Sequence, residues 1–207
     1  MFFLTLAVYN ISYFNSDADK SRKIIVILSL IGACVWSIIN FSTLILNTDK
    51  WLITGFLTMF YLIPNEKIKL RNLPFLKSVF VSLIWSLVAV GQNQFSNFIT
   101  IATFAFSFFL VYALIQPFDM RDSEIDSVKT IPNVFGAKTA ISIAMIAIVL
   151  ASAILLLLTH NIFISILNMS VFGGSILLSQ KLNKDPIYLG FLEPLFVIQS
   201  IFFYQML

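Results

Sequence analysis

The sequence carries too little charge for a water-soluble domain of its length. Only 11% of its 207 residues are Asp, Glu, Lys or Arg, whereas soluble domains carry roughly 25%. The single cysteine, Cys34, excludes an internal disulfide, and the single histidine, His160, has no second imidazole with which to share a metal ion. No phosphate-binding glycine loop, dinucleotide fingerprint, zinc-protease motif or nucleophile elbow occurs, so no residue pattern supports an enzyme of those classes.

Hydrophobic residues, by contrast, make up 59% of the chain and include 22 Phe. They occur in runs separated by short polar stretches, which is typical of a helical bundle whose outer solvent is lipid. We therefore predict an all-α, multi-pass transmembrane bundle that forms one domain over residues 1–207. The runs predict about eight helices, near residues 1–15, 24–46, 51–63, 75–91, 95–116, 137–158, 162–180 and 187–207.

The basic residues are distributed unevenly between the loops. All but one of the 13 Lys and Arg fall in alternate loops, and the exception is Lys50. The positive-inside rule places such loops in the cytoplasm, and an even number of helices then places both termini outside. We expect a multi-pass protein of a bacterial cytoplasmic membrane. The placement of basic residues in cytoplasmic loops also explains the net charge of +3, so we expect no nucleic-acid partner.

Most acidic residues lie in the same loops, which the positive-inside rule does not require. Asp119, Asp122 and Asp126 have the spacing i, i+3 and i+7, so they share one face if the stretch is helical. Like charges in one row destabilise a helix unless a cation lies against them, and Mg²⁺ prefers oxygen ligands such as carboxylates beside substrate phosphates. A solvated loop at the membrane edge, partly neutralised by Arg121 and Lys129, accounts for the same spacing.

The stretch 116–140, which reads QPFDMRDSEIDSVKTIPNVFGAKTA, resembles the second aspartate-rich motif of the UbiA-type membrane prenyltransferases. In that motif a DxxxD element is followed by a tail, Thr-(Leu/Ile)-Pro-x-x-x-Gly, that opens the next helix. The preceding basic loop, NEKIKLRNLPFLK, and the run VSLIWSLVAV resemble the family's basic loop and the helix after it, so the resemblance covers residues 60–140. The matching motif residues are Asp119, Asp122, Asp126, Thr130, Ile131, Pro132 and Gly136.

This resemblance implies a UbiA-like bundle in the lipid bilayer that transfers an isoprenyl group from a prenyl diphosphate to a lipophilic, for instance aromatic, acceptor. In the family, Mg²⁺ and basic side chains stabilise the leaving diphosphate. The resemblance makes Asp122 and Asp126 the expected catalytic residues, and it makes Asp119 a further expected Mg²⁺ ligand. The residues expected to bind the diphosphate are Asn10, Lys67, Lys69, Arg71, Lys77, Arg121 and Lys129.

The first aspartate-rich motif of the family is incomplete in this chain. Asn10 matches its leading Asn, but Phe14 and Ala18 occupy the two aspartate positions. Two alternatives therefore stay open: a UbiA-fold protein that binds lipid without transferring a prenyl group, and a small transporter whose charged loops serve only topology. The apolar runs hold few charges and show no internal repeat, which counts against the transporter.

Overall fold

The structure, a computed structural model of the 207-residue chain, contains helices and no strand in its described residues. The chain divides into two compact units, Met1–Ile63 and Pro64–Leu207. The structure describes residues 27, 28, 30–32, 34, 35, 38, 39, 48, 52–57, 75–90, 97–121, 123 and 130–182.

The described residues of the first unit are all helical. Apart from Thr48, they fall in the stretches 24–46 and 51–63, for which the sequence predicts helices. The predicted helices 1–15 and 187–207 lie outside the described residues, so the total of about eight helices stays a prediction.

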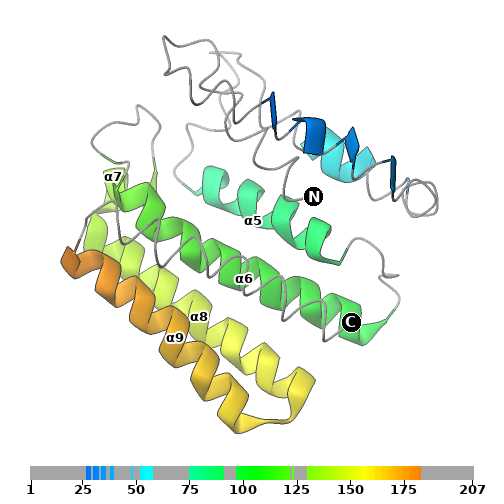
Figure 1. The fold of residues 1–207 in the computed structure, drawn as a ribbon. Coiled ribbons are helices and arrows are strands. Elements are labelled where there is room, and N and C mark those ends of the chain that lie inside the picture. The colour runs from blue at the N-terminus through cyan, green and yellow to red at the C-terminus, as the bar shows by residue number, and fades with distance from the viewer. Residues whose placement is uncertain are drawn as a thin grey trace. The chain divides into compact units, whose positions relative to one another are not determined.

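The second unit supplies the helices that can be followed from end to end (Figure 1). Three of them, α6, α8 and the Ile162–Ser179 part of α9, are long and apolar enough to cross a membrane, and α5 is a shorter apolar helix. These helices indicate a membrane protein. The helices are α5 (Leu76–Ala89), α6 (Phe98–Arg121), α7 (Ile131–Phe135), α8 (Ala137–Thr159) and α9 (Ile162–Leu182).

Asparagine side chains begin two of the long helices. The Oδ1 atom of Asn97 accepts a hydrogen bond of 3.1 Å from the backbone N–H two residues later, at the start of α6. The Oδ1 atom of Asn161 accepts hydrogen bonds from the N–H groups of Phe163 and Ile164, at 3.0 and 3.3 Å, at the start of α9. Such caps satisfy N–H groups that have no partner within the helix, so they fix where each helix begins.

Helix α6 ends five residues later than the sequence predicts, because it continues through Pro117 to Arg121. We expected the helix to end at residue 116, since proline removes one backbone hydrogen bond and clashes with the preceding turn. Membrane helices tolerate proline because neighbouring helices and side chains compensate the freed backbone groups. The predicted loop 117–138 is therefore wrong at its start, and Asp119 lies within the last turn of a helix.

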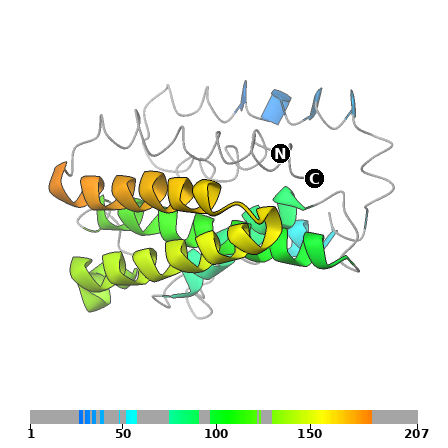
Figure 2. The same ribbon diagram turned by 90° about the horizontal axis from the view of Figure 1, so that it is seen from below.

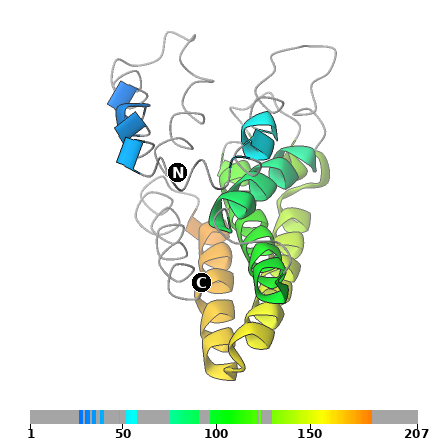
Figure 3. The same ribbon diagram turned by 90° about the vertical axis from the view of Figure 1, so that its right-hand side faces the viewer.

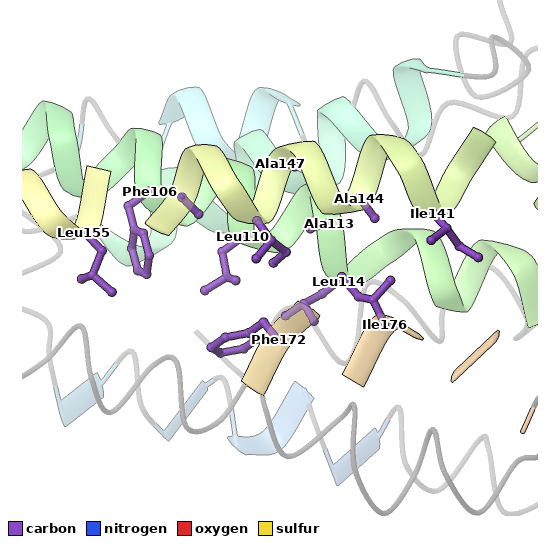
Figure 4. Packing of buried hydrophobic residues seen from close by; sticks show 12 residues of the cluster. Phe106, Leu110, Ala113, Leu114, Ile141, Ala144, Ala147, Leu155, Phe172 and Ile176 are labelled. Carbon is purple, nitrogen blue, oxygen red and sulfur yellow. The ribbon is translucent and has the colours of Figure 1, made fainter. Parts of the chain in front are cut away.

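Helix α6 is the central helix of the second unit, because it packs against α5, α7, α8 and α9. Its contact with α8 forms the main apolar core, in which Phe106, Leu110 and Leu114 of α6 meet a row of alanines on α8 (Figure 4). Small residues on one face allow two helices to approach closely, which increases their van der Waals contact. The buried alanines of α8 are Ala140, Ala144, Ala147 and Ala151.

A row of serines forms the face of α5 that is buried. Ser78, Ser82 and Ser86 are each 0% exposed and follow at intervals of four residues. The hydroxyls of Ser82 and Ser86 donate to the backbone carbonyls of Ser78 and Ser82, at 2.7 and 2.6 Å. Their hydroxyl hydrogens are therefore satisfied within α5 itself, and α5 presents a narrow, small-residue face, in keeping with its packing against α6.

The long helices of this unit run alternately in opposite directions. A tight turn at His160 and Asn161 joins α8 to the antiparallel α9 (Figures 2 and 3). At the other end, the rings of Phe75 and Phe135, which are 5.3 Å apart, join the start of α5 to the end of α7. We call this second end, which carries Lys77, Asp119, Arg121 and Lys138, the polar end. For the described helices this arrangement confirms that the basic residues gather on one side of the bundle.

Candidate functional site

A buried ion pair joins the two charged segments that the sequence analysis singled out. The Nζ atom of Lys77, in the first turn of α5, lies 2.7 Å from Oδ1 of Asp119, in the last turn of α6. The Asp119 side chain is 3% exposed and that of Lys77 is 14% exposed. These two residues, 42 positions apart in the sequence, thus meet at the polar end. The fold brings Lys77, which is expected to bind the diphosphate, against Asp119, which is expected to bind Mg²⁺.

Ser78 adds a second contact to the same carboxylate. Its hydroxyl donates a hydrogen bond of 3.2 Å to Oδ2 of Asp119. Each carboxylate oxygen therefore has a donor from α5, and these contacts offset part of the free-energy cost of removing the charge from water. The first turn of α5 is fastened to the last turn of α6 by these contacts.

Arg121 is the last residue of α6. Its guanidinium carbon lies 5.5 Å from the centroid of the Phe118 ring, a distance at which a cation is attracted to an aromatic face. A cation in the last turn is also favoured by the negative end of the helix dipole. Arg121 therefore holds positive charge at the polar end, within one turn of Asp119.

The segment that opens α8 has the order expected from its sequence. Thr130 precedes the short helix α7, Pro132 lies in the first turn of α7, and Gly136 separates α7 from α8. Gly136 has φ 84° and ψ 158°, a backbone conformation that is essentially restricted to glycine. The bend between α7 and α8 therefore requires a glycine at this position.

Two buried polar atoms near this end were missed by sequence reasoning. The Oε1 atom of Gln116 and the Oγ1 atom of Thr130 have no hydrogen-bond partner, and their residues are 0% and 1% exposed. The only signal in the sequence was a glutamine beside a proline at the end of an apolar run, which we interpreted as the point where a helix ends. Since α6 continues past Pro117, this glutamine is inside the bundle.

Most of the other predicted site residues lie outside the described residues. The contacts that the sequence predicts for them therefore stay predictions. These residues are Asn10, Lys67, Lys69, Arg71, Asp122, Asp126 and Lys129.

Asp119 is the only carboxylate in the part of the chain that the structure describes, and that part contains no group of three or more His, Cys, Asp or Glu side chains able to hold a metal ion. A Mg²⁺ ion bound to Oδ1 of Asp119, at about 2.0–2.1 Å, would place a second cation beside the Lys77 ammonium. A Mg²⁺ ion on Asp119 would share the carboxylate with the Lys77 ammonium and the Ser78 hydroxyl, and the three-aspartate metal site stays a prediction.

Comparison of the chain with family models, with curated proteins and with solved structures gave no match.

Proposed function

We propose that this chain is a UbiA-like intramembrane prenyltransferase, which transfers an isoprenyl group from a prenyl diphosphate to a lipophilic acceptor. The observation that carries this proposal is the Lys77–Asp119 ion pair, because it joins the basic segment to the start of the aspartate-rich segment at one end of an apolar bundle. Such an end offers polar groups for a diphosphate and apolar helices for its hydrocarbon chain.

The reaction requires the allylic carbon–oxygen bond of the prenyl diphosphate to break. The diphosphate leaves with the bonding electrons, the isoprenyl carbon forms a bond to the acceptor, and the acceptor loses a proton. We assign Lys77 and Arg121 to the binding of the leaving diphosphate, and Asp119 to the orientation of Lys77. Bound Mg²⁺, for which Asp122 and Asp126 are the proposed ligands, would neutralise charge that develops on the diphosphate. The apolar helices would exclude water from the reactive carbon.

A second candidate function is lipid binding by the same fold without prenyl transfer. One observation favours it: Phe14 and Ala18 stand at the two aspartate positions of the first motif. A protein with half of the expected aspartates could bind a prenyl diphosphate and lack the charge stabilisation that bond cleavage needs.

Binding of a radiolabelled prenyl diphosphate to the protein in lipid nanodiscs tests the proposal. We expect Mg²⁺-dependent binding that Asp122→Asn and Asp126→Asn each abolish. Asp185→Asn is the matched control, because Asp185 belongs to another charged loop on the predicted cytoplasmic side. Equal binding by all three variants would contradict the proposal.

The same nanodiscs, supplied with membrane lipids as acceptors, separate the two candidate functions. Prenyl transfer predicts a labelled, organic-soluble product together with free diphosphate. Mg²⁺-dependent binding without any product would instead support the second candidate.

A further inference from the structure

Three apolar side chains are exposed side by side at the polar end. Phe75, Val134 and Phe135 are 44%, 47% and 48% exposed. The ring centroids of Phe75 and Phe135 lie 5.3 Å apart, and Val134 directly precedes Phe135 on α7. Residues from the start of α5 and from α7 therefore form one patch, which we call the α7 patch.

The length of α8 indicates how deep the α7 patch lies in a membrane. With 23 residues, α8 is about 35 Å long, whereas the hydrocarbon core of a bilayer is about 30 Å thick. The ends of α8 therefore reach the lipid head groups when its middle spans the core. Only Gly136 separates α7 from α8 (Figure 1), so the patch lies near the boundary between head groups and acyl chains.

Lys138 adds a positive charge next to this patch. It is exposed and lies in the first turn of α8, three residues after Phe135. The positive end of the helix dipole disfavours a cation at this position. Asp119, the only carboxylate among the described residues, is paired with Lys77. The charge of Lys138 is thus available to an anion at the membrane surface.

This combination of side chains matches the interfacial part of an anionic phospholipid. Helices that lie in the membrane interface use apolar residues against the acyl chains and Lys or Arg against anionic head groups. An exposed apolar patch can also bind another protein. The lipid fits better, because the patch lies level with the head groups and because the three cations of the polar end, Lys77, Arg121 and Lys138, outnumber its one carboxylate.

We propose that the α7 patch and Lys138 form a binding surface for an anionic phospholipid of the surrounding membrane. The apolar side chains contact the upper part of the acyl chains, and the Lys138 ammonium contacts the phosphate. The inference goes beyond the proposed function and does not depend on it, because this lipid is a neighbour of the protein and not a reactant. Such binding fixes the depth of the polar end in the bilayer.

Native mass spectrometry of the full chain, released from detergent micelles, tests the proposal. The two probes are phosphatidylglycerol and phosphatidylcholine with the same acyl chains, which differ in the net charge of the head group. Lys138→Gln removes the proposed phosphate contact. Its matched control is Lys184→Gln, which loses the same charge in another predicted cytoplasmic loop. Phe135→Ala removes an apolar contact, and its control is Phe163→Ala, because Phe163 is 70% exposed at the start of α9, at the opposite end.

We expect the wild-type protein to bind phosphatidylglycerol more tightly than phosphatidylcholine. Lys138→Gln should lower this preference about fivefold, the effect of one basic residue at an anionic surface. Lys184→Gln should lower it less than about twofold, since salt screens distant charges. Phe135→Ala should weaken phosphatidylglycerol binding about three- to tenfold, which corresponds to the contact of half a Phe side chain. Phe163→Ala should leave that binding unchanged.

Three results would each overturn the proposal. Equal losses of preference in Lys138→Gln and Lys184→Gln would indicate a general effect of charge. Unchanged phosphatidylglycerol binding by Phe135→Ala would show that the patch does not contact the lipid. Free glycerol phosphate in excess should fail to displace the lipid, since it has no acyl chains, and displacement would show that the surface binds a phosphate group alone.

Discussion

Removing the positive partner of the ion pair should destabilise the bundle more than removing the negative one. Lys77→Met removes the ammonium that lies 2.7 Å from the Asp119 carboxylate, which is only 3% exposed, and keeps the hydrogen bond from Ser78. Loss of one member of a buried pair costs about 3–5 kcal/mol. Because Lys77 is 14% exposed and some solvent screens the pair, we expect about 3 kcal/mol.

The reverse replacement should cost less, for two reasons. Asp119→Asn keeps an oxygen that can accept the Ser78 hydrogen bond, and the partly exposed Lys77 side chain can extend its ammonium toward the membrane surface. We expect a loss of about 1 kcal/mol. The double variant that combines Lys77→Met with Asp119→Asn should be more stable than Lys77→Met alone, because no uncompensated charge remains buried.

The free energy of unfolding can be measured by titration with sodium dodecyl sulfate, followed by far-ultraviolet circular dichroism. Lys138→Met is the control, since Lys138 is an exposed lysine at the same end of the bundle, and it should change stability by less than about 0.5 kcal/mol. A loss for Lys77→Met no larger than that for Lys138→Met would refute the reasoning. The reasoning would also be refuted if the double variant lost as much free energy of unfolding as the two single variants lose together.

Two further predictions concern the backbone and a contact between helices. Gly136→Ala should destabilise the fold by about 1–3 kcal/mol because Gly136 has a positive φ. The control Gly174→Ala should cause no loss of stability, since no atom lies within 4 Å of the added Cβ. Equal unfolding midpoints of the two variants would contradict the backbone argument. The buried 3.0 Å hydrogen bond from Asn168 Nδ2 of α9 to Ser152 Oγ of α8 should give a coupling energy of about 0.6 kcal/mol in a double-mutant cycle of Asn168→Leu and Ser152→Ala. A coupling energy near zero would show that this bond does not hold α8 to α9.

The sequence predicts the described helices well where polar residues interrupt an apolar run. Asn97 and Asn161 cap the helices that follow them, and Gly136 lies at the bend that its place in the motif predicts. The failure at Pro117 has a physical cause. Rules for proline are derived from helices in water, whereas in a bundle of membrane helices neighbouring helices and side chains compensate the backbone groups that proline leaves free.

The candidate site was predictable only in part, because its main contact depends on packing. The sequence analysis placed Lys77 among the residues that bind the diphosphate and Asp119 among the ligands of Mg²⁺. Nothing in the local sequence around either residue shows that the two side chains meet. The contact depends on α5 and α6 being antiparallel and on the serine face of α5, which allows close approach. Gln116 was missed because the error at Pro117 placed it at a helix end, where side chains are solvated.

The ion pair also changes what a diphosphate at the polar end requires. Sequence reasoning counted Lys77 among the cations for the diphosphate and Asp119 among the ligands for Mg²⁺. Because the two charges lie 2.7 Å apart, the pair contributes no net charge, and a polyanion gains from Lys77 only a local hydrogen-bond donor whose direction Asp119 fixes. The net positive charge that a leaving diphosphate needs must therefore come from other cations. Within the proposed function, Mg²⁺ supplies this charge, and its proposed ligands Asp122 and Asp126 are therefore more important than their spacing alone suggested.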